Sequence, residues 1–82
     1  MTSIEQVKQY ITAGLGCTYI EVEGDGHHFY ATIVSAEFEG KRLVDRHRLV
    51  KEIIKTQLQS NEIHALSIVK AATPDEWAKL QG

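Results

Sequence analysis

The fold of this chain is decided by residues 18–35, TYIEVEGDGHHFYATIVS. Over residues 18–23, β-branched residues alternate with aromatic and acidic ones, a pattern typical of a half-buried strand. Residues 24–26, Gly-Asp-Gly, predict a turn, because glycines adopt the positive φ that a tight reversal needs. Residues 28–35 form a second run rich in β-branched and aromatic residues. Together these segments predict a β-hairpin.

Helical and turn signals flank the hairpin. Before it, Ser3 and Gln6 fit a capping box, and apolar residues recur at helical spacing. We therefore expect a helix over residues 4–13 that ends at the two following glycines. After the hairpin, residues 37–41 predict a polar connection with Gly40 as its reversal.

The second half of the chain predicts a helix, a strand and a helix. Asp45 is the expected N-cap of the first of these, and an apolar stripe recurs over residues 49–58 until Ser-Asn at 60–61 ends the helix. Residues 64–70 are largely apolar and predict a third strand. Thr73, followed by a proline and two acids, is a strong start for a short last helix.

The order α-β-β-α-β-α predicts a two-layer α/β sandwich with a small three-stranded mixed sheet and helices packed on it. We interpret residues 1–82 as a single domain without repeats or linkers. If the second and third strands run parallel, a right-handed crossover joins them. His64 would then lie near the hairpin turn that carries His27 and His28. Three of the four histidines are therefore expected to cluster at one edge of the sheet.

Composition restricts the classes of function. The 82 residues are 43% hydrophobic, enough for one modest core. Nine basic and eleven acidic residues give a net charge of −2, so binding to nucleic acid or to an anionic membrane would need a local basic patch. A single cysteine, Cys17, suits a reducing compartment. There is no signal-peptide pattern, and no apolar run approaches the ~20 residues that span a bilayer. We expect a soluble, cytoplasmic protein.

The histidines are candidate metal ligands, because imidazole binds iron, zinc or copper as a neutral ligand and titrates near neutral pH. His27, His28 and His64 at one exposed edge could form half of a metal site whose open positions are completed by a partner. Alternatively, the first two are surface turn residues and the third is a hydrogen-bonded strand terminus. Spacing alone favours this alternative. No HxxxH or CxxC motif indicates a self-contained site, and no catalytic motif indicates an enzyme.

One basic segment, residues 41–51, stands out from the rest of the chain. It could bind nucleic-acid phosphates or an acidic protein partner, or it could be a solvated helix face. Its candidate contact residues are Arg42, Arg46, Arg48 and Lys51. No GxxG loop or aromatic RNA-binding pattern accompanies the segment. Cys17, among apolar neighbours, is best interpreted as a small, partly buried residue and not as a reactive thiol.

Taken together, several motifs resemble the BolA family. They are GDGHHF at 24–29, FEGK at 38–41, RHRLV at 46–50, IHALSI at 63–68 and TPDEW at 73–77. The match covers residues 4–78, and the short Gly-Asp-Gly-x-His-Phe hairpin is similar to the acid-stress-associated IbaG (YrbA)-like branch. The resemblance implies a fold like the type II KH domain, without the GxxG loop that clamps RNA.

The resemblance also implies a partner and a cofactor. BolA-like proteins pair with monothiol glutaredoxins and share a [2Fe-2S] cluster, to which the glutaredoxin cysteine and glutathione contribute thiolates. The family's invariant histidine falls on His64, and His28 matches the hairpin histidine, with His27 as its rival. Where some members carry a loop cysteine this chain has Asp25, and Cys17 lies outside that motif. The isolated chain is expected to hold no cofactor and to be a monomer or weak homodimer.

The leading hypothesis is therefore a non-enzymatic adaptor for iron–sulfur cluster assembly, transfer, or iron and acid-stress sensing. Imidazole in place of thiolate makes a cluster less negative and raises its potential, as in Rieske centres. Imidazole ligands are also lost on protonation, so the cluster should become more labile as pH falls. The alternative hypothesis is a KH-like DNA- or RNA-binding transcriptional regulator that uses the basic helix face. A third is an interaction module whose histidines are structural.

Overall fold

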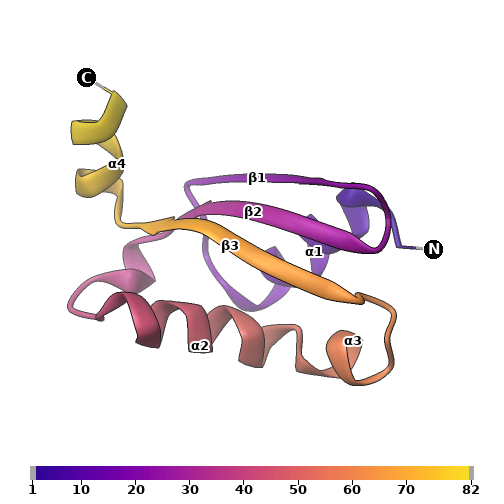
Figure 1. Cartoon of the computed structure of the whole chain (residues 1–82). Coiled ribbons are helices and arrows are strands. Elements are labelled where there is room, and N and C mark those ends of the chain that lie inside the picture. Colours follow the sequence, from indigo (N-terminus) through magenta and orange to yellow (C-terminus); the bar gives the residue numbers. More distant parts are fainter. Residues whose placement is uncertain (1, 82) are drawn as a thin grey trace.

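The observed element order is the expected one with two additional short helices, over residues 2–81, which the computed structural model describes. The elements are α1 (Ile4–Gly14), β1 (Tyr19–Gly24), β2 (His28–Val34), the 3-10 helix η1 (Ala36–Phe38), α2 (Leu43–Ile53), α3 (Lys55–Gln59), β3 (Ala65–Ala72) and α4 (Pro74–Gln81). Figure 1 shows α1, α2 and α3 on one side of the sheet, and α4 projecting from the end of β3. The predicted two-layer α/β architecture is confirmed.

The three strands form one mixed sheet in the order β1-β2-β3. β1 and β2 pair antiparallel, whereas β2 and β3 pair parallel with His28 opposite Ala65. The parallel pairing places the start of β3 beside the hairpin turn, as expected. The register shifts between Ala31 and Thr32, so Val69 of β3 has no partner on β2 and forms a β-bulge.

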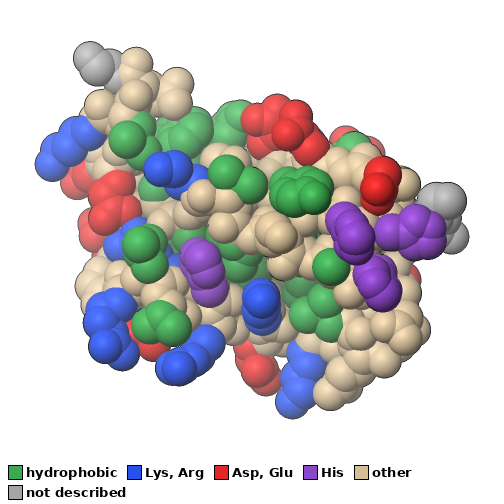
Figure 2. All heavy atoms as spheres, viewed as in Figure 1, with side chains coloured by type: hydrophobic (Ala, Val, Ile, Leu, Met, Phe, Trp, Pro, Cys, Tyr) green, Lys and Arg blue, Asp and Glu red, His purple; other side chains and the backbone are tan. Residues whose placement is uncertain are grey.

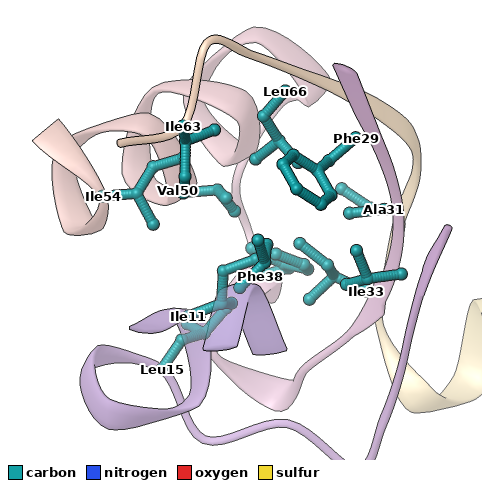
Figure 3. Close-up of a cluster of buried hydrophobic side chains, with 13 residues drawn as sticks. Ile11, Leu15, Phe29, Ala31, Ile33, Phe38, Val50, Ile54, Ile63 and Leu66 are labelled. Atoms are coloured by element: carbon teal, nitrogen blue, oxygen red, sulfur yellow. The ribbon is translucent and has the colours of Figure 1, made fainter. Parts of the chain in front are cut away.

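The hydrophobic core lies between the sheet and the helices α1 and α2. Alternate residues of β2 face it, because successive side chains of a strand point to opposite sides. Figure 3 shows side chains from both layers pointing toward one another. Those at most 2% exposed include Val7, Ile11, Leu15, Phe29, Ile33, Phe38, Val50, Ile54 and Ile63. Each such side chain contributes about 1.5–3 kcal/mol relative to an exposed position.

The first helix begins as predicted, and the second does not. Ser3 and Gln6 form the expected capping box of α1. Asp45, by contrast, does not cap α2: the helix starts at Leu43, with Arg42 in the cap position and no side-chain cap bond. The reason is that the Arg42 carbonyl already accepts the N–H of residue 45, so Asp45 lies inside the first turn, where its charge favours the helix dipole.

The segment predicted as one long helix is broken at Ile54. Its φ of −101° and ψ of 18° separate α2 from α3, and its side chain is fully buried. No glycine or proline marks this break in the sequence. The polar connection before α2 also contains the turn η1, and Gly40, with a φ of 74°, is its reversal as expected.

The strand and helix ends differ from the predicted ones by one or two residues. β1 starts at Tyr19, and β3 spans Ala65–Ala72, so His64 directly precedes this strand and does not open it. α4 starts at Pro74 after Thr73, whose hydroxyl accepts the N–H of Glu76 at 3.2 Å, as the sequence predicted for its cap. Among residues 2–81, none of the helices combines the length and the apolar character that crossing a bilayer requires.

Candidate functional site

Three histidines meet where β2 and β3 begin, and we call His27, His28 and His64 the histidine edge. The ring centres of His28 and His64 are 5.4 Å apart, with the ring planes inclined by 34°. The N–H of Ala65 donates to the His27 carbonyl at 3.1 Å and ties the hairpin turn to the start of β3. All three histidines are exposed, and Figure 2 shows histidine side chains gathered at this end of the molecule. The clustering expected from the parallel crossover is confirmed.

The hairpin turn is held in shape by Asp25. Its carboxylate accepts the backbone N–H groups of His27 and His28, both at 2.9 Å. These two hydrogen bonds, first that from His28, lower the pKa of Asp25. Gly24 is required by close packing, because a Cβ at this position would collide with the His28 carbonyl oxygen and the Phe29 ring. The role of Asp25 in turn chemistry is confirmed, and the turn is preformed.

Taken alone, the histidine edge is not a complete metal site. Among residues 2–81, no group of three or more His, Cys, Asp or Glu side chains is placed to hold a metal ion. Two imidazoles that ligate one metal through nitrogens at about 2.0–2.1 Å have ring centres roughly 5 Å apart. The 5.4 Å between His28 and His64 fits that requirement. The edge can therefore offer imidazole nitrogens to an exposed cluster whose other ligands come from another molecule.

Cys17 lies at the other end of the hairpin. It precedes β1, whose first residue Tyr19 pairs with Val34 at the end of β2. Its Sγ donates to the Leu15 carbonyl at 3.4 Å, and burial, with a contribution from the charge of Glu37, raises the pKa of the thiol. The interpretation as a small, partly buried residue is confirmed.

Arg46 corrects the expectation of a four-residue basic face. The residue is only 7% exposed, and its guanidinium donates to both carboxylate oxygens of Glu76 at 2.6 and 3.2 Å. It also donates to the carbonyls of Lys41 and Ala71, each at 2.9 Å. The hydrogen bonds from Arg46 lower the pKa of Glu76 to about 2. Arg46 therefore joins α2, β3 and α4, and its guanidinium is not free to bind phosphates.

A sequence signal for the buried Arg46 exists. It stands four positions before Val50, on the same helical stripe that continues to the buried Ile54. The other residues of the predicted basic face, Arg42, Arg48 and Lys51, are exposed as expected. Both arginines contact Asp45, at 3.2 and 3.4 Å, which reduces the positive charge of this face.

Comparisons with known proteins agree with this architecture. The sequence matches the family model described as BolA-like protein over residues 11–76. It is 43% identical over 81 residues to Protein BOLA2 of Arabidopsis thaliana, covering 94% of this chain and 85% of that protein. It is 34% identical over 74 residues to Acid stress protein IbaG of Escherichia coli (strain K12), covering 90% and 87%. Among solved structures, a BolA homologue from Coxiella burnetii superposes with a TM-score of 0.82 at 42% identity, covering 95% of this chain and 99% of that one.

Proposed function

The chain belongs to the BolA-like family, with IbaG among its relatives, and on this basis we propose that it is a non-enzymatic adaptor that partners a monothiol glutaredoxin and shares a [2Fe-2S] cluster with it. The observation that carries the proposal is the approach of His28 and His64 to 5.4 Å at an exposed edge of the sheet. The cluster is the cargo of the pair, handed on for assembly or transfer or used to sense iron or acid stress.

Each side of the complex has a distinct task. The glutaredoxin cysteine and glutathione supply thiolates, and His64 supplies an imidazole. His28 is the second candidate ligand, with His27 as its rival. The rigid strand pairing keeps His64 beside the turn, and Asp25 fixes the backbone of both turn histidines. Exposure of all three side chains leaves room for the partner.

The choice of imidazole has chemical consequences. A neutral ligand in place of a thiolate lowers the negative charge on the cluster and raises its potential. Protons compete with iron for the imidazole nitrogen, so the shared cluster is released as the solution becomes acidic. This lability suits a carrier or a sensor, and one relative bears the name of an acid stress protein.

Reconstitution tests the proposal. The chain is mixed with a monothiol glutaredoxin, glutathione, iron and sulfide, and the visible absorption and circular dichroism are compared with those of the glutaredoxin alone. His64→Ala should abolish the change that this chain induces, and either His28→Ala or His27→Ala should weaken it. His47→Ala is the matched control, because His47 lies on α2, away from the histidine edge. An unchanged spectrum with His64→Ala contradicts the proposal.

A second candidate function rests on the exposed cations of α2. Arg42, Arg48 and Lys51 form a face that could contact the backbone of DNA or RNA. Binding should fall steeply with salt and with neutralisation of Arg42 and Arg48 together. No binding to duplex DNA or to single-stranded RNA at low salt removes this candidate.

A further inference from the structure

A groove lies between the start of α2, the second half of β3 and α4, away from the histidine edge. We call it the α2–α4 groove; its volume is about 730 Å³. This is within the roughly 300–1,000 Å³ of pockets that hold a small ligand or a few side chains. Figure 2 shows Lys and Arg side chains above and below the space between α4 and α2.

The rim of the groove is cationic. Lys41, Arg42, Lys70 and Lys79 line it, and within residues 2–81 its only lining acid is Glu76, whose carboxylate is already bound by Arg46. The whole chain has a net charge of −2, so this positive field is local. Such a field attracts a negatively charged group and raises its local concentration.

The groove also exposes large aliphatic side chains. Leu43 and Val69 are each 63% exposed and Leu80 is 58% exposed, and all three line the groove. Val69 is the bulge residue of β3. Exposed aliphatic surface collected in a hollow indicates a binding site more strongly than the same residues scattered on a convex surface. The occupant therefore has apolar groups as well as negative charge.

The free edge of β3 is not open for an added strand. Arg46 donates to the Ala71 carbonyl at 2.9 Å, and both residues line the groove. The bulge at Val69 further interrupts the edge, and both features are devices that stop strands from pairing. The occupant is therefore recognised by its side chains and not by extension of the sheet.

We propose that the α2–α4 groove binds an acidic segment of a partner protein that also carries aliphatic side chains. Carboxylates of the segment pair with Lys70 and Lys79, and its aliphatic side chains contact Val69 and Leu80. A single-stranded nucleic acid matches the groove less well, because within residues 2–81 no Phe, Tyr or Trp lines it and the His47 imidazole alone offers a ring to stack on a base. The inference does not depend on the histidine edge or on cluster binding.

The test uses the full chain and a fluorescein-labelled synthetic peptide, EDLEEVLDEE, at low ionic strength. Fluorescence anisotropy measures binding, and amide chemical shifts of the unmodified chain locate it. We expect shifts at Val69, Lys70 and Leu43. A peptide with serine and glycine in place of Leu and Val should bind at least about fivefold more weakly, as should a charge-reversed lysine peptide.

Variants of the groove sharpen the test. Lys70→Glu with Lys79→Glu should weaken binding roughly fivefold or more. Lys51→Glu on α2 with Lys55→Glu on α3 makes the same charge change outside the groove and should weaken binding by less than about twofold. All four positions are exposed, and unfolding curves check that the variants fold.

Three kinds of result overturn the proposal. The first shows that binding is not specific to the groove: either the control pair of variants loses binding equally, or the peptide-induced shifts lie outside the groove. The second is tighter binding of a mixed-sequence single-stranded oligonucleotide to the same amides, which would assign the groove to nucleic acid. The third is a change in the amide chemical shifts of the groove with protein concentration in the absence of peptide. It would show that a second copy of the chain occupies the groove.

Discussion

Replacing Arg46 with alanine should destabilise the protein by about 3 kcal/mol. The guanidinium donates to two backbone carbonyls and to both carboxylate oxygens of Glu76. Loss of the donor to the Ala71 carbonyl alone costs about 1–3 kcal/mol, because a buried acceptor is left without a partner. The stacking of Arg46 over the Phe38 ring, at 5.8 Å, adds about 0.5–1 kcal/mol.

The ion pair adds little to that destabilisation, because solvent around the half-exposed Glu76 side chain weakens the pair. The total of about 3 kcal/mol therefore lies at the lower limit of the roughly 3–5 kcal/mol that removing one partner of a fully buried pair costs. For a domain of this size, 3 kcal/mol lowers the melting temperature by roughly 12–24 °C. Arg46→Lys should recover less than half of the loss, because an ammonium cannot reproduce the forked contact.

Urea unfolding measures this difference. Far-ultraviolet circular dichroism follows the helices, and the fluorescence of Trp77, the single tryptophan, follows α4. Arg48→Ala is the matched control: its side chain is 75% exposed and forms a surface ion pair with Asp45 at 3.4 Å, so the substitution should cost less than about 0.5 kcal/mol. If the free energies of unfolding of the two alanine variants lie within about 0.5 kcal/mol of each other, Arg46 does not join α2, β3 and α4.

Three further predictions concern acid, the turn and the thiol. The pKa of Glu76 is lowered from 4.5 to about 2, so its carboxylate stabilises the fold above pH 4.5 and this contribution is lost as pH falls toward 2. Acid unfolding is followed by Trp77 fluorescence, and Glu76→Gln should remove the pH dependence between 4.5 and 2. An unaltered curve would disprove the assignment of this pH dependence to Glu76. Asp25→Ala should speed loss of the reconstituted cluster by about tenfold, because the backbone of His27 and His28 is released; Asp45→Ala, an acid on α2, is the control, and equal rates would contradict the role of the turn. Cys17→Ser should leave the visible spectrum of the reconstituted complex unchanged, since the thiol is half-buried and its pKa is raised; a bleached spectrum would identify it as a ligand.

The sheet and its histidine edge could be predicted because local patterns and one topological rule were sufficient. Alternation over residues 18–35 specifies the hairpin and which of its faces is buried. A helix between the second and third strands then favours parallel pairing. That pairing brings His64 to the turn that carries His28. The residues next to each of these histidines in the sequence do not indicate the other one.

The break at Ile54 could not be predicted from local patterns, and the helical stripe that places Arg46 toward the core does not identify the acid that pairs with it. A helical stripe indicates which residues face the core. It does not indicate whether the backbone leaves the helical conformation at one of them, as it does at the fully buried Ile54. A charged residue is normally assigned to the surface. Burial of Arg46 becomes favourable only because Glu76, from a helix that follows much later in the chain, reaches the same point.

The parallel pairing of His28 with Ala65 has a consequence for the order of folding. A hairpin such as β1–β2 closes within microseconds, because its contacts are local in the chain. β3 joins β2 only after the whole crossover has been ordered, and contacts of such sequence separation form slowly. Before β3 docks, the two turn histidines lack their distant neighbour His64. The approach of the His28 and His64 rings therefore depends on a long-range strand pairing and forms together with the native sheet.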